Sequence, residues 1–168
     1  MIRFSSNINN VIAQVRAYRD NLNQLTQRII EELIAEGETI ARSEVISLDA
    51  VYTGNLANSI VHFYDAATRT GFIRCNAEYG MFVEFGTGVV GTQSPYPGEA
   101  MAAVGYRYGG GATYVQLEDG RVGWYYPADD GKWYFTEGQP SRPFMYNTAR
   151  MVARDVIPIA RQVFAGAR

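Results

Sequence analysis

The feature that most constrains the fold of this chain is its first quarter, which has a strongly helical pattern. Between Asn7 and Ser47 there is no proline and a single glycine, Gly37. Apolar residues recur there mostly every three or four positions, the spacing that gathers side chains on one face of an α-helix. They are Ile8, Val11, Ile12, Val15, Tyr18, Leu22, Leu25, Ile29, Leu33, Ile40 and Ala41. The pattern predicts a helix of roughly 40 residues, which at about 1.5 Å per residue is on the order of 60 Å long.

A helix of this length exceeds the width of a compact chain of 168 residues, whose radius of gyration is about 15 Å. Two outcomes are open. The helix breaks, at 21–23 or at Gly37, or part of it projects and needs a partner over its apolar stripe. Two sets of its apolar residues lie seven apart: Val11, Tyr18 and Leu25, and Val15, Leu22 and Ile29.

This heptad spacing is typical of a coiled-coil seam, and also of an amphipathic helix packed on its own core. We take Leu22, Leu25 and Ile29 as candidate partner-interface residues. The charge distribution also suggests contacts between copies of the chain. Residues 1–28 carry four arginines and one aspartate, a net charge of +3. Residues 29–50 carry six acidic residues and one arginine, a net charge of −5. Opposite signs suit head-to-tail contacts between copies, and two ordinary solvated faces are the alternative.

The stretch from Tyr79 to Thr87 is apolar with one carboxylate, Glu84, and we predict a central strand there. A covered carboxylate needs a cation or several hydrogen-bond donors, or it takes up a proton. Arg142, at the expected start of the last helix, has the planar guanidinium suited to this role. We therefore predict a Glu84–Arg142 pair that joins the sheet to the final helix. The alternative, with both side chains solvated, stays open at this point.

Three blocks of sequence, in this order after a long helix, are Thr53–Ile60 (TGNLANSI), Phe82–Thr87 (FVEFGT) and Arg142–Met145 (RPFM). Together they resemble the neck, or head–tail joining (minor tail component), family of long-tailed bacteriophages. They cover a minority of the chain, and the segment from Gly88 to Glu137 is longer than in a minimal member.

The resemblance implies a structural virion protein with no cofactor, assembled in the host cytoplasm. It implies a ring of six or twelve copies between the head connector, or head-closure proteins, and the tail proteins. The implied fold is α+β: an antiparallel sheet flanked by a long N-terminal helix and a C-terminal helix. The element order read from the residues agrees with this, and it adds an inserted β-meander.

The chain length and its 47% apolar content indicate one globular domain spanning residues 1–168. We expect the long helix over 1–47, the sheet over 52–87 and a flexible loop over 88–111 that orders only against a neighbour. Two strands within the sheet, 59–64 and 70–76, form a hairpin. The meander follows over 112–137 and the C-terminal helix over 141–165, with Ser141 as its cap and Pro158 inside it.

Aromatic residues gather in the predicted meander: Trp124, Tyr125, Tyr126, Trp133, Tyr134 and Phe135. Cross-strand aromatic pairs stabilise such a sheet, and the same residue types anchor protein interfaces. Stacking on a sugar is a third possibility. We take Tyr96, Trp124, Tyr126 and Trp133 as further candidate interface residues.

Several classes are disfavoured by composition. A net charge of −2 argues against a nucleic-acid binder. The single histidine, His62, and the single cysteine, Cys75, argue against a zinc site and a disulfide framework. No long apolar run suggests a membrane span, and no supported nucleophile or acid–base pair suggests an enzyme.

The preferred interpretation is therefore a non-enzymatic neck protein. A tail-terminator or tail-completion subunit is the alternative within virion proteins. An aromatic-lined glycan- or peptide-binding module is the alternative of another class.

Overall fold

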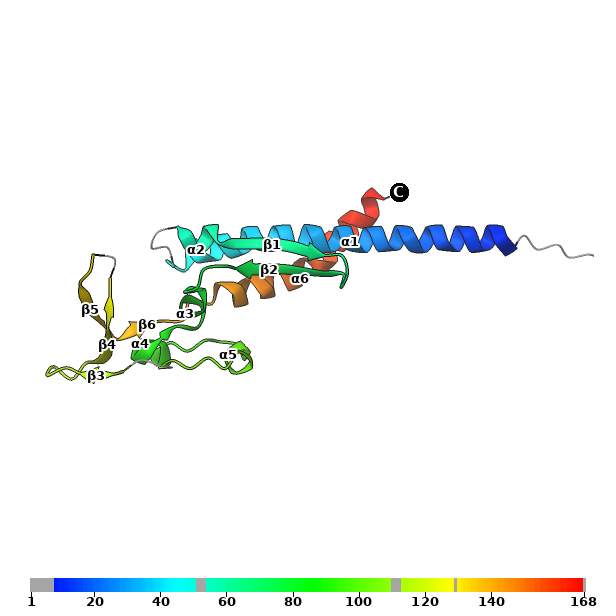
Figure 1. Cartoon of the computed structure of the whole chain (residues 1–168). Helices are drawn as coiled ribbons and strands as arrows, with labels where there is room; N and C mark the ends of the chain where they lie inside the picture. The colour runs from blue at the N-terminus through cyan, green and yellow to red at the C-terminus, as the bar shows by residue number, and fades with distance from the viewer. Residues whose placement is uncertain (1–7, 51–53, 110–112, 129, 168) are drawn as a thin grey trace, which may run out of the picture.

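The structure is a computed structural model, and it describes residues 8–50, 54–109, 113–128 and 130–167. Its long elements are two helices, and its strands form two small sheets (Figure 1). In chain order the elements are α1 (Ile8–Ser47), α2 (Asn55–Asn58), β1 (Ile60–Asp65), β2 (Thr70–Cys75), α3 (Gly80–Phe85), α4 (Gly88–Gln93), α5 (Ala100–Ala103), β3 (Val115–Gln116), β4 (Val122–Pro127), β5 (Trp133–Thr136), β6 (Gly138–Gln139) and α6 (Phe144–Gly166). The chain is an α+β protein, as predicted.

Helix α1 is continuous over 40 residues, so of the two outcomes left open by the sequence the unbroken helix is the one that occurs. Gly37 is buried, because the hairpin and α6 both approach the helix there: a Cβ at this position would overlap Ile73 Cδ1 and Val152 Cγ2. The glycine therefore serves close packing. The hairpin and α6 lie along the C-terminal half of α1, and its N-terminal half extends past both of them (Figure 1).

Strands β1 and β2 pair antiparallel from Ile60↔Cys75 to Asp65↔Thr70, which confirms the predicted hairpin. One face of the hairpin packs on α1, where Gly71 approaches the side chains of Ile30 and Ile34. The main core lies where α1, α2, the hairpin, α3 and α6 meet. It consists of Ala41, Val45, Leu56, Ile60, Val83 and Phe144.

The predicted central strand over Tyr79–Thr87 is wrong, because this stretch forms the short helix α3. The amide of Gly80 bonds to the carbonyl of Ala77, and the amide of Val83 to that of Tyr79. A short apolar run flanked by glycines fits a buried helical turn as well as a strand, and periodicity does not separate the two. The expected sheet over 52–87 is thus a two-stranded hairpin followed by a helix.

The segment predicted as a flexible loop, 88–111, contains the short helices α4 and α5. Those residues form helical turns rather than a loop, and the flexibility of the segment stays a prediction. That the segment orders only against a neighbour stays a prediction. Residues 110–112 lie outside the described part of the chain.

The predicted meander is confirmed as a separate three-stranded sheet of order β3-β4-β5, antiparallel throughout. It stands at the end of the molecule opposite the free end of α1 (Figure 1). Strand β6 follows it and bridges back to Thr87 and Gly88. Helix α6 then begins at Phe144, three residues later than predicted, and runs through Pro158 without interruption.

Candidate functional site

The best-defined polar site joins α3 to the start of α6, and we call it the clasp; it comprises residues 80–86 and 139–146. Its central side chain is Glu84, which is only 6% exposed. The carboxylate oxygens accept the backbone N–H groups of Met145 (2.9 Å) and Tyr146 (3.0 Å). Glu84 is therefore the N-terminal cap of a helix that begins sixty residues further along the chain.

The sequence at the start of α6 explains why this cap comes from elsewhere. The N-cap position is Pro143, whose side chain has no oxygen to accept a hydrogen bond. The first amides of a helix lack partners within it. Here the Phe144 amide bonds to the carbonyl of Arg142, and Glu84 accepts the next two. The predicted cap, Ser141, instead donates its hydroxyl to the Glu84 carbonyl (2.7 Å).

Arg142 lies in the clasp, but the predicted ion pair with Glu84 is not formed. Its Nε donates to the carbonyl of Leu48 (3.1 Å) and its Nη1 to Gln139 Oε1 (3.4 Å). Its hydrogen bond to α3 comes from the backbone amide, which donates to the carbonyl of Val83 (2.9 Å). The guanidinium therefore ties the strand before α6 to the end of α1. The backbone amides of Met145 and Tyr146, and not the Arg142 guanidinium, are the partners of the Glu84 carboxylate.

The clasp also contains hydrogen bonds in the opposite direction. The segment before α6, residues 139–142, which we call the strap, donates to backbone carbonyls of α3. Gln139 Nε2 donates to the Phe82 carbonyl (3.0 Å), beside the bonds to Val83 and Glu84. The approach is so close that a Cβ on Gly86 would lie 2.6 Å from the Ser141 nitrogen. Gly86 also has φ 79° and ψ 171°, a conformation that is essentially restricted to glycine.

A tyrosine completes the surroundings of Glu84. The Tyr96 hydroxyl donates a hydrogen bond to the carboxylate, and the Tyr96 ring packs edge-on against Phe85 at 4.8 Å and Tyr146 at 5.6 Å between centroids. Burial raises the pKa of Glu84 above its ordinary value, more than its three hydrogen bonds lower it. Burial, with the nearby carboxylate, raises the pKa of Tyr96 to about 12.

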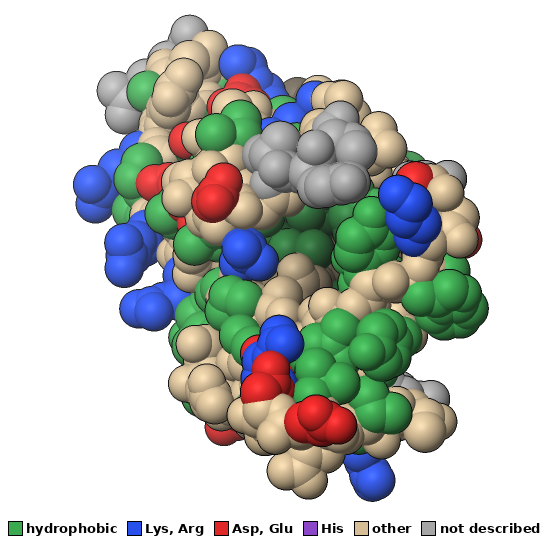
Figure 2. All heavy atoms as spheres, turned by 90° about the vertical axis from the view of Figure 1, so that its left-hand side faces the viewer, with side chains coloured by type: hydrophobic (Ala, Val, Ile, Leu, Met, Phe, Trp, Pro, Cys, Tyr) green, Lys and Arg blue, Asp and Glu red, His purple; other side chains and the backbone are tan. Residues whose placement is uncertain are grey.

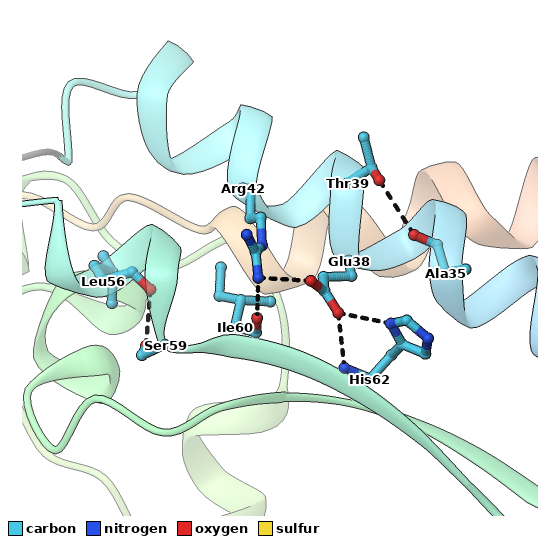
Figure 3. A network of polar contacts seen from close by, with 8 residues as sticks. All are labelled: Ala35, Glu38, Thr39, Arg42, Leu56, Ser59, Ile60 and His62. Carbon is cyan, nitrogen blue, oxygen red and sulfur yellow. Dashed lines mark hydrogen bonds and ion pairs between the residues drawn. The ribbon is translucent and has the colours of Figure 1, made fainter.

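A second polar network joins the hairpin to α1 (Figure 3). Glu38 Oε2 accepts the backbone amide of His62 (3.0 Å) and lies 2.6 Å from His62 Nδ1. Glu38 Oε1 lies 2.6 Å from Arg42 Nη2, which also donates to the Ile60 carbonyl (3.0 Å). The pKa of Glu38 is lowered, first by the hydrogen bond from His62 and next by the charge of Arg42. His62 thus joins the hairpin to α1 through Glu38.

The predicted interface residues of α1 lie where the covered and uncovered parts of the helix meet. Leu22 is exposed, whereas Leu25 and Ile29 are half-buried. Beyond them toward the N-terminus, Val15 is 62% exposed and Tyr18 67% exposed. The apolar stripe of this half is not covered by the described part of the chain.

The predicted aromatic interface residues divide into two kinds. Tyr96 packs into the clasp, and Trp124 packs on its own chain, edge-on to Tyr114 and against Gly88. Tyr126 and Trp133 are exposed on the meander, Trp133 by 66%. Figure 2 looks onto this end of the molecule and shows hydrophobic side chains grouped on its surface.

Within the described ranges, no group of three or more histidine, cysteine, aspartate or glutamate residues is placed to hold a metal ion. Nor is any helix there long and apolar enough to cross a bilayer. One hollow of about 640 Å³ is lined by residues 98–103, and another of about 480 Å³ lies along the end of α6. Neither is lined by Glu84, by Arg142 or by a predicted interface residue.

Sequence reasoning missed the capping role of Glu84, the place of Tyr96 beside it, and Glu38 as the partner of His62. One signal was present for the first. A proline at the N-cap, with no acceptor side chain, leaves the first amides of α6 in need of an outside acceptor. No local signal links Tyr96 or Glu38 to its partner, because each contact depends on the tertiary fold.

Comparisons with protein-family models, with curated proteins and with solved structures find no match to this chain.

Proposed function

We propose that this chain is a non-enzymatic structural subunit that assembles with copies of itself, and that it serves at the neck of a tailed bacteriophage, between the head connector and the tail. The observation that carries the proposal is the projecting half of α1, with its uncovered apolar stripe. Val15, Tyr18 and their neighbours lie in water in the isolated chain. Contiguous exposed apolar surface of this kind marks a protein–protein contact.

The energetics favour a covered state. Burying one large apolar side chain contributes about 1.5–3 kcal/mol, and six on this part of α1 are exposed. They are Ile8, Val11, Ile12, Val15, Tyr18 and Leu22. Even after the entropy of association is subtracted, such a stripe supports a stable contact between subunits.

The assignment to a phage neck rests on the three sequence blocks, and their arrangement supports a structural role for them. Leu56 and Ile60 from the first block, Val83 from the second and Phe144 from the third share one core. Glu84 accepts the backbone amides of Met145 and Tyr146 within the clasp and the hydroxyl of Tyr96 beside it. A carboxylate that is 6% exposed and held in this way positions a helix.

The test combines solution mass with imaging. Native mass spectrometry and negative-stain microscopy of the purified chain should show a closed ring, of six or twelve copies by the family resemblance. Mass spectrometry of purified virions from the source should find the chain, and antibody labelling should place it at the head–tail junction. Absence from virions would contradict the neck assignment.

The same labelling separates the neck role from that of a tail terminator or tail-completion protein. A neck protein should remain on filled heads that lack tails. A tail terminator should remain on the ends of free tails.

A second candidate function, a glycan- or peptide-binding module, is favoured by one observation: the meander presents exposed aromatics on both faces, with Tyr126 paired to Tyr134 on one face and the 66% exposed Trp133 on the other. Titration with glycan and peptide panels, followed by tryptophan fluorescence, tests it. Binding that Trp133→Ala abolishes, and that Trp124→Phe preserves, would favour the module over the assembly role.

A further inference from the structure

The projecting half of α1 carries an unbroken heptad pattern. From Ile8 to Ile29 seven apolar residues are spaced alternately by three and four, so that every a and d position over three heptads is apolar. The a positions are Ile8, Val15, Leu22 and Ile29, and the d positions are Val11, Tyr18 and Leu25. The next two positions of the pattern are Glu32 and Glu36, so the seam ends there.

The exposed stripe continues a surface that the chain itself covers further along α1. Glu44 accepts a hydrogen bond from Asn147 of α6, so its side of α1 faces that helix. Val15 precedes Glu44 by 29 residues, close to eight full turns at 3.6 residues each, and therefore lies on the same side. Helix α6 ends at Gly166, and the N-terminal half of α1 extends past it (Figure 1). The element that would cover the exposed stripe on this side of α1 is therefore a helix, as α6 is further along.

We infer that the occupant is the same segment of a second copy, residues 8–29, packed parallel and in register as a coiled coil. The inference deepens the proposed function and rests on the self-assembly that it includes. Three of the four a positions are β-branched, which suits parallel pairing. Parallel, in-register contacts also fit any rotational symmetry about an axis along the helices.

The residues that flank the seam agree with pairing between identical segments. In a parallel coiled coil a g position faces the e position of the next heptad on the partner helix. Here g Gln14 would face e Arg19, and g Asn21 would face e Thr26. No like charges meet at these g–e positions, so they do not oppose pairing of the segment with itself. The segment as a whole carries a net charge of +2, which opposes the pairing and which salt screens.

Cysteine cross-linking tests the arrangement. Val11→Cys and Leu22→Cys are made separately in a Cys75→Ser background, so that the only thiol lies in the seam. Under mild oxidation each variant alone should form a disulfide-linked dimer. A mixture of the two, with one variant carrying a mass tag, should form no 11–22 link above background. An antiparallel seam would give the reverse pattern and would overturn the inference.

Charge in the seam provides an independent test that does not depend on oxidation. Val15→Glu with Leu22→Glu places two unpaired carboxylates in each copy of the seam and should weaken self-association at least about 100-fold. The matched control, Ala13→Glu with Gln24→Glu, adds the same charge on the opposite face and should leave association within about threefold. Thermal unfolding should show an intact body in both variants, because residues 13–24 lie outside the core.

The outcomes separate this inference from the proposed function. Rings that form without same-residue cross-links, and that tolerate Val15→Glu with Leu22→Glu, would overturn the inference and leave the neck proposal standing. Cross-linked pairs that never close into rings and are absent from virions would support the inference and overturn the neck proposal. Binding of an acidic partner helix in place of a second copy would also overturn the inference.

Discussion

Removing the Glu84 carboxylate should destabilise the whole protein, because it caps a helix from another part of the chain. Glu84→Ala leaves the amides of Met145 and Tyr146 without their acceptor. An orphaned buried donor costs about 1–3 kcal/mol, which brackets the loss between about 2 and 6 kcal/mol. The carboxylate is itself destabilised by burial, as its raised pKa indicates, and its removal returns part of that loss.

We therefore expect Glu84→Ala to lower the free energy of unfolding by about 2–4 kcal/mol. At about 2–4 °C per kcal/mol for a chain of this size, Tm falls by about 4–16 °C. Glu84→Gln should lose about 1–3 kcal/mol, because its amide oxygen satisfies one N–H while its NH2 faces the other. Urea unfolding followed by circular dichroism gives the free energies.

Hydrogen exchange locates the effect, since the amides of Met145 and Tyr146 should exchange faster in Glu84→Ala than in the parent protein. The control is Glu78→Ala, which removes an exposed carboxylate just before α3 and should change stability by less than about 0.5 kcal/mol. If Glu84→Ala matches that control, or if the two amides keep their protection, the capping argument is refuted.

The pH dependence follows from the same group. Because the pKa of Glu84 is raised in the folded state, the folded state binds a proton more readily than the unfolded state. The contribution of Glu84 to stability is then greatest below its ordinary pKa of 4.5 and falls as pH rises through the folded pKa. The stability gap between the parent protein and Glu84→Gln should widen as pH is lowered toward 4.5.

Three further perturbations test other parts of the structure. Gly86→Ala should lose about 1–3 kcal/mol from backbone strain alone, and more from overlap with the strap, in urea unfolding. Glu38 has a lowered pKa, so its stabilising contribution is present above pH 4.5 and lost as pH falls through its folded pKa. Glu38→Gln should therefore make the free energy of unfolding less sensitive to acid between pH 7 and pH 3.5. An unchanged dependence of that free energy on pH would contradict this. Trp133→Ala should change stability by less than about 1 kcal/mol, since the side chain is 66% exposed; a larger loss would show that the meander depends on it for folding.

The local elements could be predicted because their signals lie within a few residues of each other. Helix α1 follows from its apolar spacing and its lack of proline. The β1–β2 hairpin and the meander follow from short β-rich runs separated by polar turns. Each of these elements satisfies its backbone hydrogen bonds locally, so its pattern is readable in the sequence.

The candidate site could be predicted only in part. Glu84 was correctly singled out as a carboxylate that requires a partner, and the start of α6 was the correct place to look. The type of partner was wrong, because an arginine is visible in a sequence while a free backbone amide is not. Tyr79–Thr87 was assigned to a strand for a related reason: a short buried helix and a buried strand have the same composition.

The sequence by itself determined the long helix with its heptad stripe, the hairpin, the meander and the need of one buried carboxylate for donors. Only the tertiary structure decided that α1 stays unbroken, that α3 is a helix and that Glu84 caps α6. The physical reason is separation along the chain. The bonds from Met145 and Tyr146 to Glu84 join residues 61 and 62 positions apart, and nothing in either local sequence specifies the other until packing of the core brings them together.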